Sequence, residues 1–443
     1  MRKLLFKTSL TVAAAVATTL VFGQEEAPGS YKTTVAGKVY IQQINTIANK
    51  AAIKKAFQTI VDKQPQTLQD HMLLTKIPAP PYQEMQRAKK YAEMLKAAGA
   101  DSVWIDNVGN VIARRKGKGG GKKVVVLEGH LDTVFPEGTD VKIKHKGDTL
   151  YAPGIADDTR ALAVVLTVLK TVEKENIETD ADVLFIGAVG EEGPGDLRGV
   201  KNLFSNKGPG KIDAYIAVDG TGMDRIVHRG LGSHRYHITF KGPGGHSSGA
   251  FGLVNPHNAL GRAIHYWALD ADKFSRQPGE RVTYNVGVIG GGTSVNSIPF
   301  ESWMEVDMRS ESPERVAGID KLLQDAVQRA LKEENQMKRM GPDLTVDVKM
   351  VGDRPSGVED PATPFVQRAI AATSYFNTGA ILGVGSTNAN IPIARGVPAV
   401  TIGSGGKSGG AHALNEWFLD DKGYQATQRA LLLLVAEAGI AAK

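Results

Sequence analysis

A chain of 443 residues is longer than one hydrophobic core normally fills, so we expect two domains. Hydrophobic residues at 42% and charged residues at 23% exclude disordered and fibrous classes, and the absence of cysteine excludes disulfides, cysteine nucleophiles and thiolate metal sites. The net charge of +6 is modest, and its densest basic stretch, residues 114–123, is interleaved with glycines like a solvated loop, so no nucleic-acid partner is expected.

The N-terminus has the pattern of a secretory leader. Arg2 and Lys3 supply positive charge, and a largely apolar run follows over residues 10–22. The run is too short and too rich in Ala and Thr for a membrane span, which favours cleavage near Gly23. We therefore expect a signal peptide at residues 1–23, a flexible spacer at residues 24–40, and a mature periplasmic or secreted protein without membrane attachment.

The next part of the chain alternates helices and strands. Helical spacing of apolar residues predicts helices over residues 44–61, 82–98 and 159–174. Nearly continuous apolar runs predict buried parallel strands over residues 123–127, 183–189 and 212–218. This alternation is typical of an open α/β sheet.

The pattern changes near Gly230 and changes back near Arg354. Alternating apolar and polar residues predict strands over residues 233–241, 282–289, 301–308 and 344–351, with helices over residues 256–269 and 313–337. Afterwards the chain returns to α/β character, with a helix over residues 363–375, a strand over 399–402 and a helix over 424–438. We expect a discontinuous α/β domain, residues 41–230 and 353–443, interrupted by a compact α+β domain at residues 231–352.

Candidate functional side chains follow the predicted strands where each ends. His130 and Asp132 come just after the first strand, Glu191 and Glu192 after the second, and Asp219 after the third. Open α/β sheets bind ligands at this edge. Taken alone, His130 and Asp132 are equally well explained as a loop His with a capping Asp, and Glu191, Glu192 and Asp219 are better explained as solvated loop acids.

Two further candidates lie on loops. Asp157 directly precedes Asp158 and the predicted helix over residues 159–174, where a helix cap is the simpler explanation, although an Asp on a fixed backbone can also bridge two cations. His412 follows two glycines near the C-terminus and supplies a second imidazole. Because the chain has no thiol, this set of carboxylates and imidazoles favours a two-metal hydrolase site.

Several motifs together resemble one known family. They are GHLDTV at residues 129–134, APGIADD at 152–158, GEEG at 190–193, VDG at 218–220, KGPGGHSS at 241–248 and SVNSIP at 294–299. The chain is similar to the dinuclear zinc exopeptidases and amidohydrolases that include carboxypeptidase G, peptidase T, aminoacylase and succinyl-diaminopimelate desuccinylase. The resemblance implies a zinc-exopeptidase-like catalytic domain with a central, mostly parallel sheet, and an inserted α+β lid and dimerisation domain.

The resemblance also implies roles for the candidate residues. His130 and Asp219 would bind one zinc ion, Glu192 and His412 the other, and Asp157 would bridge them, although cobalt or manganese would also fit. Asp132 would orient His130. Glu191 would be the general base that moves a proton from the attacking water to the leaving nitrogen. The peptide bond between Asp157 and Asp158 is expected to be cis.

In the lid, the resemblance implies a homodimer in which His246 reaches the active site of the partner subunit and stabilises an oxyanion. Asn296 and Arg309 match positions that hold the substrate carbonyl or a terminal carboxylate, although Arg309 is also explained by pairing with a local acid. Asn388 stands where the family usually has Asp, which puts substrate contacts on that loop in doubt.

The expected function is hydrolysis of a peptide or N-acyl amino acid amide bond by an exported enzyme. The sequence leaves open whether the substrate presents a free amino end, a free carboxyl end or an N-acyl group. One alternative is an exported protein of the same fold that binds peptides or metals without cleaving them, although such a protein has no need of Glu191. A second is a serine hydrolase, because residues 245–249 match Gly-x-Ser-x-Gly, but no helical pattern begins before Pro256.

Overall fold

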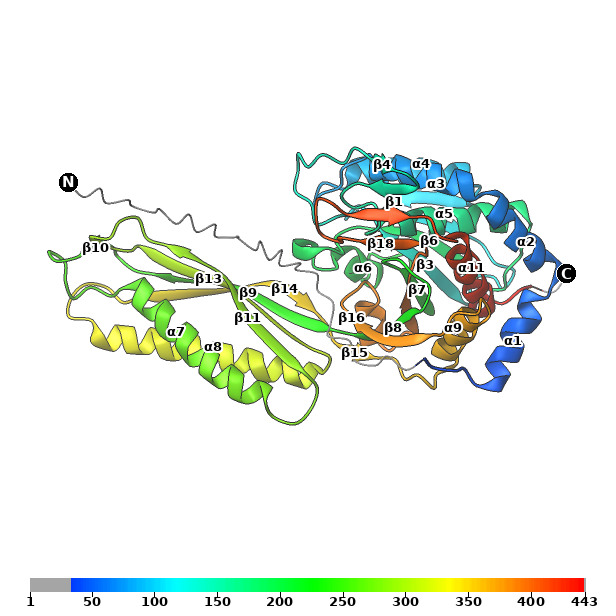
Figure 1. The fold of residues 1–443 in the computed structure, drawn as a ribbon. Coiled ribbons are helices and arrows are strands. Elements are labelled where there is room, and N and C mark those ends of the chain that lie inside the picture. The colour runs from blue at the N-terminus through cyan, green and yellow to red at the C-terminus, as the bar shows by residue number, and fades with distance from the viewer. Residues whose placement is uncertain (1–32, 442–443) are drawn as a thin grey trace, which may run out of the picture. The chain divides into compact units, whose positions relative to one another are not determined.

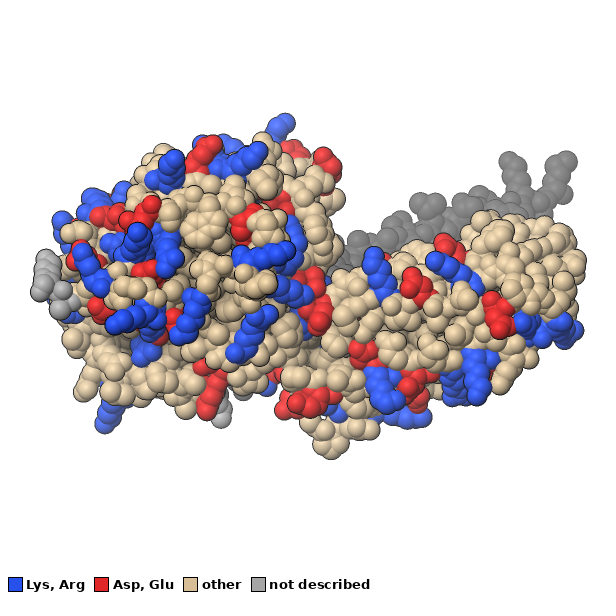
Figure 2. Space-filling view, turned by 180° about the vertical axis from the view of Figure 1, so that it is seen from behind, with Lys and Arg blue, Asp and Glu red and all other residues tan. Residues whose placement is uncertain are grey.

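The computed structural model describes residues 33–441 (Figure 1). The predicted signal peptide and most of the predicted spacer lie outside the described residues. Between residues 33 and 441, no helix combines the length and the apolar character needed to cross a membrane. On the face drawn in Figure 2, acidic and basic side chains are interspersed, in keeping with the modest net charge.

The largest sheet is mixed, and its centre is parallel. Its strand order is β1-β2-β6-β3-β7-β17-β8-β15, with β16 paired to β8. The strands are β1 (Ser102–Ile105), β2 (Val111–Arg115), β3 (Val124–His130), β6 (Asp182–Ala188), β7 (Ala214–Val218), β8 (Arg225–Gly230), β15 (Gly357–Val358), β16 (Ile381–Gly385) and β17 (Ala399–Ile402). The central pairs β6-β3, β3-β7 and β7-β17 are all parallel. This confirms the predicted fold class.

Helices cover both faces of this sheet. They are α4 (Met85–Ala97), α5 (Thr159–Lys174), α6 (Arg198–Leu203), α9 (Pro364–Ser374), α10 (Asn390–Ala394) and α11 (Tyr424–Ala438), and α1 (Lys38–Ala48), α2 (Ala51–Asp62) and α3 (Gln64–Thr75) pack on these helices. In β3, Val125 and Leu127 join the apolar cluster under α5 and α11, whereas Val124 and Val126 join the cluster under α6 and α10. Because successive strand residues point to opposite faces, a strand covered on both sides must be apolar throughout.

The helices of the N-terminal part differ from the prediction in two ways. The single helix expected over residues 44–61 is two helices, α1 and α2, because the backbone leaves the helical conformation at Lys50, where it is extended. Helix α3 was not predicted at all. Its buried side chains include Thr67, Asp70 and His71, so it lacks the apolar stripe that marks a helix in a sequence.

The second sheet is antiparallel and lies within residues 232–354, here called the insertion. Its order is β11-β13-β9-β14, formed by β9 (Gly232–Lys241), β11 (Val282–Gly291), β13 (Glu301–Ser310) and β14 (Thr345–Arg354). Helices α7 (Pro256–Ser275) and α8 (Pro313–Met337) pack on it (Figure 1). Phe240, Trp267 and Met304 belong to its own apolar core.

Two small sheets complete the fold. In the insertion, β10 (Gly245–His246) pairs with β12 (Ser297–Ile298). The other has the order β18-β19-β5-β4, formed by β4 (Lys144–Lys146), β5 (Thr149–Tyr151), β18 (Lys407–Gly409) and β19 (Trp417–Leu419). This second sheet brings the chain just before Asp157 beside the chain on either side of His412.

Candidate active site

The predicted metal ligands meet at the carboxyl edge of the large sheet. His130 is the last residue of β3, Asp219 directly follows β7, and Glu192 lies on the loop after β6. Because β6, β3 and β7 are parallel neighbours, their carboxyl ends lie side by side and their loops converge.

Asp157 lies between two imidazoles. Its Oδ1 is 3.0 Å from Nε2 of His130, and its Oδ2 is 3.2 Å from Nε2 of His412. Nε2 of His412 is also 3.1 Å from Oε1 of Glu192. Each oxygen of one carboxylate thus faces a different imidazole, which is the arrangement that a carboxylate bridging two cations requires.

The possible ligand atoms form two overlapping groups. One consists of His130, Asp157 and Asp219, and the other of Asp157, Glu192 and His412, each with its ligand atoms within 4.8 Å of one another. A third group, which combines His130 with Glu191 and Glu192, overlaps the first two. The donors are imidazole nitrogens and carboxylate oxygens, a set that fits zinc and related divalent cations.

Burial and neighbouring charges shift the pKa values of the groups in this cluster. Burial raises the pKa of Glu192 and of Asp219, and the neighbouring charge of Asp157 raises both further. Burial alone would also raise the pKa of Asp157, but hydrogen bonds from His130 and His412 outweigh it and lower that pKa. The hydrogen bonds to Asp157 and Glu192 raise the pKa of His412 to about 11. Buried carboxylates crowded in this way are stabilised by cations.

Asp132 connects two of the converging loops. Its carboxylate is fully buried and accepts the backbone N–H groups of Glu191 at 3.0 Å and Glu192 at 2.8 Å. Nδ1 of His130 is 3.1 Å from the backbone oxygen of Asp132 and 3.6 Å from its Oδ1. The backbone oxygen is therefore the closer partner of the imidazole, and the carboxylate mainly holds the Glu191 loop.

Glu191 is a nearly buried carboxylate beside the ligand cluster. Its Oε1 is 3.3 Å from Nη1 of Arg354, and Nη2 of Arg354 donates to the backbone oxygen of Glu191. Burial raises the pKa of Glu191 well above its usual range, and the charge of Glu192 adds to this, whereas Arg354 opposes it. A carboxylate with a raised pKa is suited to accept and return a proton.

Three contributors to the site were not predicted from the sequence. Arg354, at the end of β14, was noted only as a domain boundary. Asp158 is fully buried, and its Oδ2 accepts the backbone N–H of His130 at 3.1 Å. Glu416 is also fully buried, and burial together with the charge of Asp157 raises its pKa to about 7. No motif marks Glu416, because its partners are backbone groups.

The peptide bond between Asp157 and Asp158 is cis, as expected.

The predicted lid residues lie elsewhere, in the insertion. His246 is exposed on β10, and its Nδ1 accepts the backbone N–H of Gly249 at 3.1 Å. Asn296 lies close to it, since its carbonyl accepts the N–H of Ser247 at 2.9 Å. Arg309 pairs with Asp307 at 2.8 Å. Among the described residues, no hydrogen bond or ion pair joins His246, Asn296 or Arg309 directly to the metal-ligand cluster.

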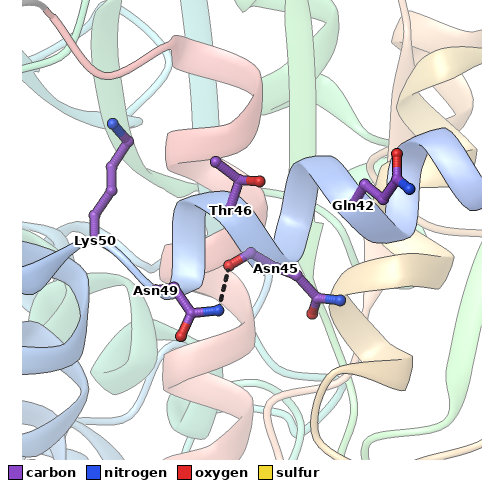
Figure 3. Close-up of a pocket in the computed structure, with 5 residues that line it drawn as sticks. All are labelled: Gln42, Asn45, Thr46, Asn49 and Lys50. Carbon is purple, nitrogen blue, oxygen red and sulfur yellow. Dashed lines mark hydrogen bonds between the residues drawn. The ribbon is translucent and has the colours of Figure 1, made fainter.

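Two other features do not form a second catalytic site. Ser247 follows the two-residue strand β10 and no helix begins before α7, so the Gly-x-Ser-x-Gly segment is not a strand-to-helix elbow. A hollow on α1 is lined only by Gln42, Asn45, Thr46, Asn49 and Lys50 (Figure 3). This lining has neither a carboxylate nor an imidazole.

Comparisons with known proteins agree with this geometry. The model of peptidase family M20/M25/M40 matches residues 126–437. The chain is 25% identical over 307 residues to carboxypeptidase G2 of Pseudomonas sp. (strain RS-16), which covers 66% of this chain and 68% of that protein. It is 28% identical over 233 residues to acetylornithine deacetylase of Myxococcus xanthus, which covers 49% of this chain and 58% of that protein.

Solved structures show the same fold. Aminopeptidase PepT from Bacillus cereus ATCC 10987 matches with a TM-score of 0.65 and 20% identity, over 84% of this chain and 98% of that one. The M20 metallo-carboxypeptidase Sso-CP2 from Sulfolobus solfataricus matches with a TM-score of 0.64 and 17% identity, over 84% of this chain and 99% of that one. Since the family model spans well over half of the chain, including every predicted metal ligand, this protein belongs to peptidase family M20/M25/M40, whose metal-dependent members hydrolyse peptide or amide bonds.

Proposed function

We propose that this protein is an exported dinuclear zinc hydrolase that cleaves a small peptide or an N-acyl amino acid, as a peptidase T-like or carboxypeptidase G-like exopeptidase. The observation that carries the proposal is the position of Asp157 between His130 and His412, with one oxygen toward each. A protein that only binds peptides has no use for a bridging carboxylate next to a nearly buried Glu191.

The residues divide between two metal positions. His130 and Asp219 would hold one ion, Glu192 and His412 the other, and Asp157 would contact both. Bound zinc polarises a carbonyl group and lowers the pKa of water. The protein's own contribution is to fix these ligands on three strand ends and two loops, with Asp132 and Asp158 holding them from behind.

Glu191 is the proposed proton carrier. Its carboxylate accepts a proton from the attacking water as the oxygen–carbon bond forms, and delivers that proton to the leaving nitrogen as the carbon–nitrogen bond breaks. Arg354 contacts Glu191 at 3.3 Å and favours its charged form, which opposes the rise that burial causes in the pKa of this carboxyl group.

The decisive experiment compares the wild-type protein with Glu191→Gln, both loaded with zinc, on a panel of dipeptides, tripeptides and N-acyl amino acids read by mass spectrometry. We expect Glu191→Gln to retain two zinc ions and to lose about 10²-fold to 10⁴-fold in kcat. Glu178→Gln, on the surface, serves as the control. Equal turnover by Glu191→Gln would refute the role of Glu191, and a zinc-loaded wild-type protein that cleaves nothing would favour the non-catalytic alternative. The bond that breaks identifies the substrate class.

The proposed homodimer follows from the family resemblance, and it is supported by His246, which is exposed and, within residues 33–441, forms no hydrogen bond or ion pair with the ligand cluster of its own chain. We place His246 in the active site of the partner subunit, with Asn296 and Arg309 toward the substrate. Mixing His246→Ala with Glu191→Gln tests this, because a mixed dimer contains one site with both functional groups intact. We expect two nearly inactive proteins to regain activity on mixing, and no recovery would contradict action across subunits.

Export is proposed from the sequence pattern of residues 1–23 alone. The full chain should be found outside the cytoplasm of a bacterial host, and Edman sequencing of the mature protein should start close to Gln24. An uncleaved chain that stays in the cytoplasm would contradict the proposal.

A further inference from the structure

Glu416 holds the segment that carries Asp157. Its Oε2 accepts the backbone N–H of Gly154 at 2.7 Å, and its Oε1 accepts those of Ala156 at 2.7 Å and Asp157 at 3.0 Å. The side chain is fully buried. One carboxylate therefore receives three backbone donors from four consecutive residues, the last of which is the central ligand of the cluster.

The same residue belongs to the loop that carries His412. Only three residues separate His412 from Glu416, and β19 begins at the next residue, Trp417. Strand β19 pairs with β5, so that Trp417 lies opposite Tyr151, and the backbone oxygen of Glu416 accepts the N–H of Ala152 at 3.1 Å. Backbone pairing and the Glu416 carboxylate together join the Asp157 segment to the His412 loop.

The two metal positions depend on this junction to different extents. His130 and Asp219 lie at the ends of adjacent parallel strands, β3 and β7, so the sheet itself holds two of the three ligands of one position, and Asp157 is the third. His412 lies on a loop with a side chain that is 56% exposed, and its Nε2 is 3.2 Å from Oδ2 of Asp157, the ligand whose backbone N–H Glu416 accepts. The position formed by Asp157, Glu192 and His412 is therefore the one that the junction supports.

We propose that Glu416 is a positioning residue that sets Asp157 against His412 and thereby completes the second of the two metal positions. The inference deepens the proposed dinuclear function and rests on it. Without this carboxylate, three backbone N–H groups lose their acceptor inside the protein, and satisfying them again requires the Asp157 segment to move. Partners that lie behind metal ligands typically change metal affinity by about 10-fold to 100-fold when they are replaced.

The test is a zinc titration of metal-free protein against a chromogenic chelator, which measures two binding steps without relying on activity. Glu416→Gln keeps the size of the side chain but has one acceptor oxygen instead of two, and places an N–H₂ group against backbone donors. We expect the weaker of the two zinc affinities to fall by about 10-fold to 100-fold, with little change in the tighter one. Glu416→Asp retains both oxygens on a shorter arm, and should recover part of the loss.

The control is Glu334→Gln in the insertion. Glu334 is also buried and accepts one backbone N–H, from Asn255 at 2.7 Å, and it contacts no metal-ligand segment. It should lose stability without changing either zinc affinity. Unchanged zinc binding by Glu416→Gln, equal weakening of both steps, or an equal effect of Glu334→Gln would each overturn the proposal. If Glu416→Gln does not fold, the Glu416→Asp titration decides by the same criteria. A wild-type protein that binds fewer than two zinc ions would instead refute the dinuclear function itself.

Discussion

The side-chain amide of Asn388 donates a hydrogen bond of 2.7 Å to Oε1 of Glu128. Glu128 lies in β3, two residues before His130, and Asn388 follows β16. The two residues are 1% and 2% exposed, so this hydrogen bond is buried. Burial raises the pKa of Glu128 to about 8, although the Asn388 hydrogen bond opposes this.

Replacing Asn388 by Asp should destabilise the protein, even though Asp is the usual residue of the family at this position. The change places two buried carboxyl groups in contact and removes the N–H donor. We expect the free energy of unfolding in urea to fall by about 1 to 3 kcal/mol. The double variant Glu128→Gln, Asn388→Asp restores one donor and one acceptor in exchanged positions. It should be more stable than Asn388→Asp alone, and a further loss of stability would show that the contact is not the cause.

Asp132 gives a second prediction. Its Oδ1 accepts the backbone N–H of Glu191 and its Oδ2 accepts that of Glu192, so both carboxylate oxygens are used. Asp132→Asn retains the shape of the side chain but turns one acceptor into a donor that faces an N–H group. We expect zinc affinity to fall by about 10-fold to 100-fold, measured by titration of the metal-free variant. Asp182→Asn, which alters a buried acid at the other end of the sheet, is the matched control. Loss of zinc affinity in both variants to the same extent would argue for general destabilisation.

Strand ends that are visible in the sequence predicted where several candidate residues lie, whereas their roles as ligands, and those of Asp157 and His412, came from the family resemblance. Buried parallel strands are runs of apolar residues, and the polar residue that follows such a run lies at the edge of the sheet, as His130 and Asp219 do. The same argument places Glu191 and Glu192. These positions required only the order of the elements and the parallel arrangement of their strands.

What the sequence did not reveal is contact between segments far apart in the chain. Glu416 acts on backbone groups about 260 residues away, and backbone groups leave no mark in a sequence. Arg354 contacts Glu191, which lies 163 residues earlier in the chain, and nothing in the sequence near either residue indicates that they meet. Helix α3 escaped prediction because its buried face is partly polar. Its side chains find partners such as Thr167, Thr159 and Lys170, which only the tertiary structure supplies.

Arg354 leads to a prediction about the pH dependence of catalysis. Its guanidinium lowers the pKa of Glu191 against the effect of burial. In Arg354→Met the pKa of Glu191 should rise, and because the base must be deprotonated to accept a proton, the acidic limb of the kcat/KM profile should move to higher pH. Arg368→Met, which breaks an ion pair with Glu437, is the control. If the acidic limb does not shift in Arg354→Met, Arg354 does not control the pKa of Glu191 during catalysis.

His71 gives a prediction about stability and pH. It is fully buried in α3, and its Nε2 donates to the carbonyl of Ile155 at 2.5 Å, two residues before Asp157. Burial, aided by the charge of Arg160, lowers the pKa of His71 from 6.5 to about 3. The folded protein therefore resists protonation of a group that the unfolded chain protonates readily.

This difference in pKa between the folded and the unfolded chain decides how stability changes with pH. Above pH 6.5 the imidazole is neutral in both states and favours neither, but as the pH falls from 6.5 toward 3 the unfolded chain takes up a proton and is stabilised. At pH 4.5 the loss should be about 2 to 3 kcal/mol. We expect zinc-free His71→Gln to be less stable than zinc-free wild type at pH 7, because it packs less well, but to lose less stability between pH 7 and pH 4.5. His265→Gln, which changes an exposed imidazole, should follow the wild type. Equal losses in the wild type and in His71→Gln, measured by urea unfolding at the two pH values, would mean that another group controls stability in acid.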